Sequence, residues 1–176
     1  MTEFLVEHRF INGTAAMVID LDRCTRCDDC VNACADGHDN NPRFLRSGPI
    51  HGHHMIAGAC MHCVDTVCMI GCPTGAIHRS QLHGEVLINE GTCIGCGTCA
   101  SSCPYDNIRL VAIRDRQNQE KVMIDPDQGR AILKATKCDL CVDHDGGPAC
   151  ERACPNNAMR RIDLHRLDTY ADWLNQ

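Results

Sequence analysis

The stretch that decides the fold is Cys93-Ile-Gly-Cys96-Gly-Thr-Cys99-Ala-Ser-Ser-Cys103-Pro104. Two residues separate each of its first three cysteines from the next, so three thiols can converge on one point from a single tight loop. Cys103 comes three residues later, where the chain has turned away. Its thiol is therefore expected to serve a neighbouring centre, and this run implies a partner run elsewhere in the chain.

Three further cysteine groups lie on either side of this run. Each ends in the same C-x3-C step, and two of the three continue into proline, whereas the first has Ala35 at that place. The central gap widens to four residues in the second group and to eight in the fourth. The three groups are Cys24, Cys27, Cys30 and Cys34; Cys60, Cys63, Cys68 and Cys72; and Cys138, Cys141, Cys150 and Cys154.

The four groups use all 16 cysteines of the 176-residue chain. So much cysteine is typical of a disulfide scaffold, of zinc ribbons or of iron–sulfur proteins. A disulfide framework has no reason to repeat this spacing and needs an oxidising compartment. Zinc ribbons pair two C-x2-C knuckles and do not use three-plus-one runs. The observed spacing is that of 4Fe–4S clusters, so the sequence predicts four of them.

The second and third groups are separated by one predicted hairpin, so we expect them to exchange their fourth cysteines. The first and fourth groups then pair around the outside. The predicted ligand sets are the Cys24 set (Cys24, Cys27, Cys30, Cys154), the Cys60 set (Cys60, Cys63, Cys68, Cys103), the Cys93 set (Cys93, Cys96, Cys99, Cys72) and the Cys138 set (Cys138, Cys141, Cys150, Cys34).

This pairing predicts an α+β fold of two ferredoxin-like halves, the second inserted into the first, with short hairpins and long cluster-binding loops. The inner half spans residues 57–113, and the outer half comprises residues 1–56 and 114–176. Apolar, β-branched segments and turn residues predict the other elements. We expect strands at 15–22, 131–136 and 158–164, hairpins at 74–89 and 108–124, a loop at 36–56 and a short helix at 168–176.

Composition limits the interior and the partners. The chain has three Phe, two Tyr and one Trp, so something other than large side chains must fill its core. Its formal charge is −6, and each loaded cluster adds about −2 more, so nucleic acid is an unexpected partner. The N-terminus resembles no signal peptide, and no apolar run approaches the ~18 residues of a membrane span. We expect a cytoplasmic protein; export with a signal-bearing partner stays open.

Two histidine-containing stretches admit more than one interpretation. His51, His53 and His54 lie in one short loop and could bind a metal or serve as surface residues. His62, with Met61 beside it, lies within the second cysteine group. Both side chains could pack against a cluster, and His62 could instead donate a hydrogen bond to a cluster sulfur atom.

Residues 15–165 resemble the four-cluster iron–sulfur electron-transfer subunits of dimethyl sulfoxide reductase, formate dehydrogenase and formate hydrogenlyase. All four groups occur in the family's order, and Cys138-Asp-Leu-Cys141…Gly147-Pro-Ala-Cys150…Cys154-Pro155 is especially similar. Some members replace a cysteine of the third group by tryptophan, but here Cys96 is present. Membrane-linked members carry long insertions, whereas only 34 residues separate Cys103 from Cys138. Parts of the first two groups also look like modules fused to cyclic-nucleotide-binding domains.

The resemblance implies a subunit that passes electrons between a catalytic oxidoreductase subunit and a second donor or acceptor protein. The catalytic partner is expected to be a molybdenum or tungsten enzyme, such as an aldehyde or formate oxidoreductase. A nickel–iron hydrogenase partner, a redox-sensing regulatory module and a free polyferredoxin stay open, as does self-association. The chain has no Gly-rich dinucleotide loop and no nucleophile–base pair, so we expect no catalytic residues of its own.

Overall fold

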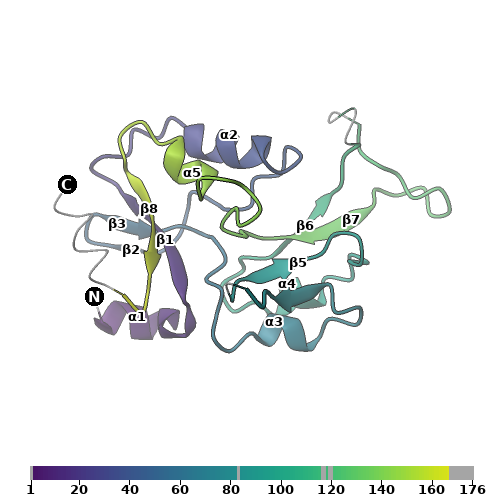
Figure 1. The fold of residues 1–176 in the computed structure, drawn as a ribbon, viewed down its shortest axis with the longest axis horizontal. Helices are drawn as coiled ribbons and strands as arrows, with labels where there is room; N and C mark the ends of the chain where they lie inside the picture. The colour runs from purple at the N-terminus through teal and green to yellow at the C-terminus, as the bar shows by residue number, and fades with distance from the viewer. Residues whose placement is uncertain (1, 83, 116–117, 119–120, 167–176) are drawn as a thin grey trace.

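A computed structural model describes residues 2–82, 84–115, 118 and 121–166 (Figure 1). Short helices and short antiparallel strands make up the chain, so the α+β class predicted from the sequence is confirmed. The helices are α1 (Thr2–Glu7), η1 (Phe10–Asn12), α2 (Asp29–Asp36), α3 (Val67–Ile70), α4 (Thr98–Ser102) and α5 (Ala149–Arg152). The strands are β1 (Ala15–Asp20), β2 (Ile50–His51), β3 (His54–Ile56), β4 (Ile77–Arg79), β5 (Val86–Ile88), β6 (Arg109–Ala112), β7 (Leu133–Thr136) and β8 (Met159–Asp163).

The largest sheet has four strands in the order β2-β3-β1-β8. Its central strand β1 is buried along its whole length because successive side chains point to opposite faces and both faces are covered. Met17 and Ile19 pack in a core that contains Cys34 and Cys150, and Val18 packs in another with aromatic residues of the N-terminal segment. One face of this sheet therefore supports cysteine groups one and four.

The strands expected at 15–22 and 158–164 are confirmed as β1 and β8. The loop expected over 36–56 is wrong at its C-terminal end, where β2 and β3 form a hairpin. This hairpin adds to the free edge of β1, where Val18 is the register partner of Ile56. Ile56 is buried in the same core as Val18, which explains why this part of the segment is ordered as a strand.

The inner cysteine groups are surrounded by two small sheets. The hairpin expected at 74–89 is confirmed as β4 paired with β5. The hairpin expected between 108–113 and 121–124 forms only in part: Arg114 bridges Val122 and the Met123 N–H donates to the Ile113 carbonyl oxygen, whereas β6 itself pairs with β7. Residues 121–124 make only isolated bridges, and Ile124 is 54% exposed, whereas Ala135 of β7 is 3% exposed. The segment whose side chains are buried, β7, is therefore the one that pairs with β6.

β7 lies in the segment that the predicted division assigns to the outer half, yet it pairs with β6 of the inner half. Residues 133–136 therefore lie beside the inner cysteine groups, and the division into two halves stays a prediction. The helix expected at 168–176 lies outside the described residues. None of the helices in the described part of the chain is long and apolar enough to cross a membrane.

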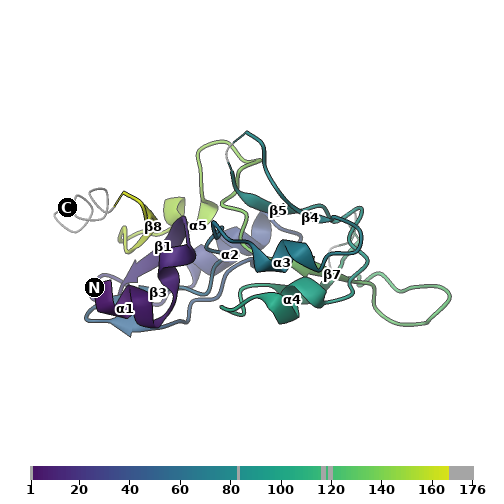
Figure 2. The same ribbon diagram turned by 90° about the horizontal axis from the view of Figure 1, so that it is seen from below.

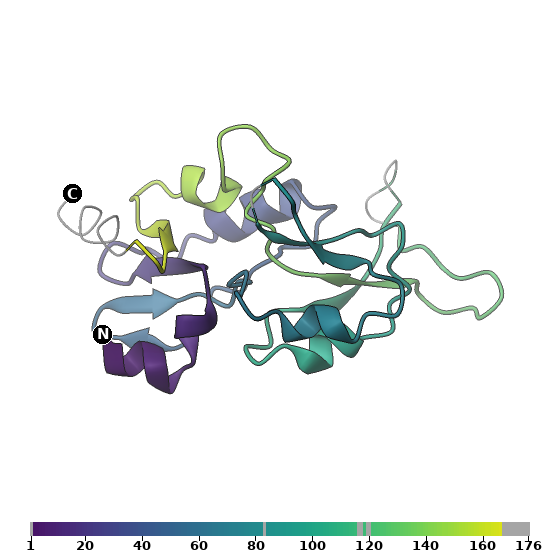
Figure 3. The ribbon, with the colours of Figure 1, turned by 60° about the horizontal axis from the view of Figure 1, so that its bottom comes forward.

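The four cysteine groups each contain one short helix, and these helices pack in two pairs. α2 of group one lies against α5 of group four, and α3 of group two lies against α4 of group three. Figure 3 shows the α3–α4 pair apart from the α2–α5 pair, and Figure 2 shows α3 beside α4. Group one is thereby placed beside group four, and group two beside group three, as the sequence spacing predicts.

Candidate metal centres

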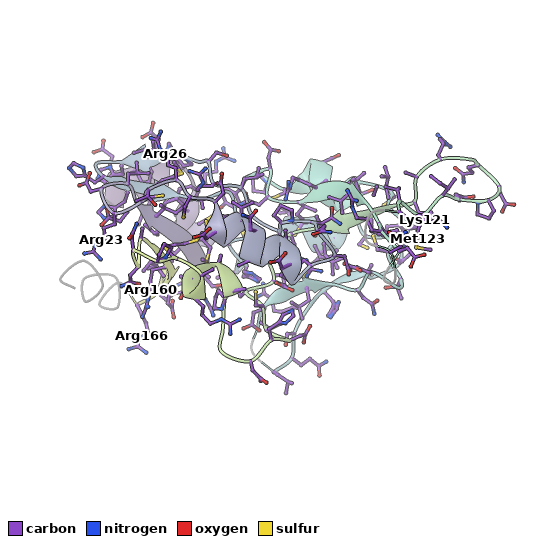
Figure 4. All side chains as sticks on the ribbon, turned by 90° about the horizontal axis from the view of Figure 1, so that it is seen from above. Arg23, Arg26, Lys121, Met123, Arg160 and Arg166 are labelled. Carbon is purple, nitrogen blue, oxygen red and sulfur yellow. The ribbon has the colours of Figure 1, made fainter. Side chains whose placement is uncertain are left out.

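The thiols of the Cys24 set lie around one cavity at the end of the four-stranded sheet. All four residues of the set line it, together with Arg26 and Arg46. Burial raises the pKa of Cys30, and the charges of Cys154 and Cys24 add to this. Figure 4 places Arg26 and Arg160 at the same end of the molecule. Cys154 is thus gathered with the first group although it belongs to the fourth in sequence.

The thiols of the Cys60 set lie around a second cavity, and all four residues of the set line it. Burial, and after it the charges of Cys60 and Cys103, raises the pKa of Cys63 to about 11. The pKa of Cys68 is raised to the same value for the same reasons. Cys103 therefore lies with the second group, although its sequence position is in the third.

The remaining eight thiols belong to the Cys93 set and the Cys138 set. Burial raises the pKa of Cys99, and the charges of the other three thiols of the Cys93 set add to it. Burial likewise raises the pKa of Cys150, and so do the other three thiols of the Cys138 set. The structure therefore brings together all four members of each predicted set. Their role as cluster ligands stays a prediction.

In each of the four sets, one cysteine sulfur also accepts a hydrogen bond from a backbone N–H. The distances from the nitrogen to Sγ are 3.2 Å for Ala158 to Cys154, 3.5 Å for His62 to Cys60, 3.5 Å for Ala135 to Cys93 and 3.2 Å for Arg43 to Cys34. Such donors favour the anionic sulfur that iron requires and are among the features that set cluster potentials.

The thiols of the chain differ in acidity. Burial raises the pKa of Cys138 to about 12. By contrast, the backbone N–H of Ile77 and then the Thr74 hydroxyl lower the pKa of Cys72 to about 7. Iron binding requires thiolates, so loading of the Cys138 set must release protons that the buried thiols hold tightly.

The orphaned nitrogen of His62 provides a test of whether a cluster fits beside the Cys60 set. The Val86 N–H donates to His62 Nδ1 at 3.0 Å, so Nε2 carries the proton of the neutral ring. Burial lowers the pKa of His62 to about 2, which keeps the ring neutral. Nε2 is buried and has no hydrogen-bond partner among the described residues. A cluster sulfide is one acceptor that would satisfy such an N–H, and the four thiols that line the cavity of the Cys60 set fit the same group.

Met61 is 2% exposed and lies in a core with Phe4, Phe10 and Val18. It also lines the cavity of the Cys60 set, and its packing against a cluster stays a prediction. The metal site considered for the loop from His51 to His54 does not form among the described residues. His53 pairs with Asp22 at 3.1 Å, and the His51 ring packs against Phe4.

Sequence reasoning missed a polar network that links three cysteine groups. Arg43 Nη1 lies 2.5 Å from Asp139 Oδ2, and Arg43 Nη2 lies 3.1 Å from Glu90 Oε1. His38 Nε2 lies 3.5 Å from Asp139 Oδ1, while its Nδ1 contacts the Cys34 carbonyl at 2.6 Å. His38, Asp139 and Cys141 offer ligand atoms within 4.8 Å of one another, but all three touch or belong to the Cys138 set. They are therefore part of that centre.

Comparisons with known proteins give one consistent family. Residues 52–164 match the 4Fe–4S dicluster domain model, and residues 21–37 match a 4Fe–4S binding domain model. Electron transport protein HydN of Escherichia coli K12 is 33% identical, over 86% of this chain and 90% of its own. Hydrogenase-4 component A of the same organism is 32% identical, over 79% and 78% of the two chains. An iron–sulfur protein of Rhodospirillum rubrum is 35% identical, over 81% and 79%.

Proposed function

The chain belongs to the 4Fe–4S dicluster domain family of iron–sulfur electron-transfer proteins, and from this premise we propose that it relays electrons through four 4Fe–4S clusters. The relay connects a catalytic oxidoreductase subunit with a second redox protein. One observation carries the proposal: 16 thiols gather in four sets of four, and every set takes its fourth member from another group. Each bound cluster supplies a one-electron acceptor; the chain supplies the thiolates, the N–H donors and the shielding from water.

The contacts between sets support one order along the relay. α2 packs on α5, which joins the Cys24 set to the Cys138 set. The Cys60 charge contributes to the raised pKa of the buried Cys138, so these two sets adjoin. α3 packs on α4, which joins the Cys60 set to the Cys93 set. The proposed order is therefore Cys24 set, Cys138 set, Cys60 set and Cys93 set.

The ends of this order carry the exposed cysteines. Cys27 and Cys96 are exposed, and they belong to the first and last sets of the order. Electron exchange with another protein needs a cluster near the surface, so the two end sets are the expected points of contact. A redox sensor needs one exposed, labile cluster and no chain of buried ones, which favours the relay over the regulatory alternative.

The apolar surface beside Cys96 supports docking of the catalytic subunit at that end. Ile94 is 64% exposed, Leu110 is 37% exposed and Leu133 is 41% exposed. Gly97 and Gly95, on either side of Cys96, approach Leu110 and Leu133 respectively. Exposed apolar patches of this kind mark interaction surfaces. The family resemblance favours a molybdenum or tungsten enzyme that acts on formate or an aldehyde as this partner.

A second candidate partner has one specific observation in its favour, because a similar relative is named as a hydrogenase-4 component. Anaerobic purification of the native protein with its partners separates the candidates. We expect about 16 iron atoms per chain, four one-electron couples and a co-purifying molybdenum or tungsten protein. Nickel in the partner would select the hydrogenase. A chain with fewer than four couples, or one that purifies alone with a single oxygen-sensitive cluster, would contradict the relay.

A further inference from the structure

Lys137 is a buried lysine directly before the first cysteine of group four. It is 3% exposed. Its ammonium group donates to the Cys138 carbonyl oxygen at 3.0 Å and to the Val86 carbonyl oxygen. The side chain therefore reaches from the start of group four to β5 of the inner region, where two carbonyl oxygens hold its ammonium group.

A buried lysine is normally paired with an anionic group. In the described part of the chain, no carboxylate forms an ion pair with Lys137. Burying an ion without a partner costs several kcal/mol after relaxation, and two carbonyl dipoles offset only part of this cost. An anion near Lys137 is expected to complete the site.

Lys137 lies between two of the predicted centres. Val86, whose carbonyl it contacts, lines the cavity of the Cys60 set. Cys138, whose carbonyl it also contacts, is the first ligand of the Cys138 set. One charge therefore lies beside two sets that adjoin in the proposed relay.

We propose that Lys137 is a shared counter-ion for the two middle clusters and raises the reduction potential of both. The inference rests on the proposed function, which places anionic clusters in these sets. Reduction adds one electron to a cluster, so a nearby positive charge stabilises the reduced form more than the oxidised form. Lys137 is therefore a positioning residue for charge in the relay, and it touches no substrate.

The test is a potentiometric titration, followed by electron paramagnetic resonance, of the full-length loaded protein. Lys137→Met removes the charge with little change in side-chain length, Lys137→Arg keeps it, and Lys121→Met is the control. Lys121 is exposed and lies toward the opposite end of the molecule from Arg26 (Figure 4). Cys68→Ser and Cys150→Ser identify which couples belong to the two middle sets.

In Lys137→Met we expect the reduction equilibrium constants of both middle couples to fall about tenfold, which is about 59 mV for a one-electron couple. The two end couples of Lys137→Met should keep their native reduction potentials. All four couples of Lys137→Arg and of Lys121→Met should titrate as in the native protein. Unchanged middle couples in Lys137→Met would overturn the inference while leaving the relay standing. Fewer than four couples in the native protein would instead overturn the relay.

A variant that fails to bind iron is also informative. Gln can still donate to both carbonyl oxygens without a charge, so Lys137→Gln separates the hydrogen bonds from the charge. If both neutral variants lose iron while Lys137→Arg retains it, the charge is required and the inference stands. If Lys137→Arg loses iron as well, Lys137 has a packing role only and the inference fails.

Discussion

Arg43 and Asp139 join two cysteine groups that lie far apart in the sequence, with Arg43 Nη1 2.5 Å from Asp139 Oδ2. Burial alone would raise the pKa of Asp139, but the His38 hydrogen bond and the Arg43 charge outweigh it and hold this pKa well below its usual range. The Arg43 backbone N–H also donates to Cys34 Sγ. One arginine thus ties the segment after group one to the ligands of the Cys138 set.

Replacing Arg43 by Met should therefore loosen the Cys138 set. The change leaves Asp139 largely buried with only His38 as its partner and removes the arginine contact, which costs about 1–3 kcal/mol. The loaded protein should lose its visible iron–sulfur absorption at a temperature roughly 5 °C lower than the native protein. Arg130→Met is the control, because Arg130 is exposed and, in the described part of the chain, its guanidinium contacts the nearby Gln128. Equal melting of both variants would show that the pair contributes little.

Gly95 should be required for the Cys93 set. Its φ is +70°, and an added Cβ would lie 2.2 Å from the Leu133 carbonyl oxygen. Gly95→Ala should force the cysteine loop away from β7 and release iron from this set first, measured as loss of one couple. Gly75→Ala is a matched control, since φ is +64° there and no atom lies within 4 Å of the added Cβ. Loss of the same couple in both variants would show that backbone strain alone is responsible.

Ile94→Glu should weaken binding of the catalytic subunit without affecting the clusters. A charge at this exposed position must be desolvated when an apolar interface forms. We expect normal iron content with at least a tenfold loss of co-purifying partner. Ile11→Glu is the matched control, because Ile11 has the same exposed fraction of 64% and lies on η1, beside the four-stranded sheet. Full partner recovery with Ile94→Glu would place the interface elsewhere.

Removal of iron should unfold most of the chain. The chain has few aromatic side chains, and cysteines are part of the two hydrophobic cores around β1 and around Ile77. Without the iron–sulfur clusters, the spaces between the buried thiols become voids, and the loops that carry the ligands are no longer cross-linked. Far-ultraviolet circular dichroism after chelation should show loss of most secondary structure and cooperative recovery on reconstitution. Retention of the native spectrum by the iron-free chain would contradict this expectation.

The grouping of the thiols could be predicted from the sequence because cysteine spacing is local and repeated. The strand at β1 could be predicted because its apolar run is unbroken. The pairing of β6 with β7 could not, because residues 121–124 are as apolar as 133–136 and only the tertiary core distinguishes them. The Arg43–Asp139 contact and the position of Lys137 also escaped prediction, since a single charged residue has no periodic pattern.

The Cys103→Ala variant distinguishes an exchange of fourth cysteines from ligation within each group. Cys63→Ala and Cys99→Ala serve as references, because they identify the couples of the Cys60 set and the Cys93 set in the same titration. With exchanged fourth cysteines, Cys103→Ala should damage the couple lost in Cys63→Ala and leave the couple lost in Cys99→Ala intact. If Cys103→Ala instead removes the Cys99 couple and spares the Cys63 couple, the exchange, and with it the proposed arrangement of the relay, is contradicted.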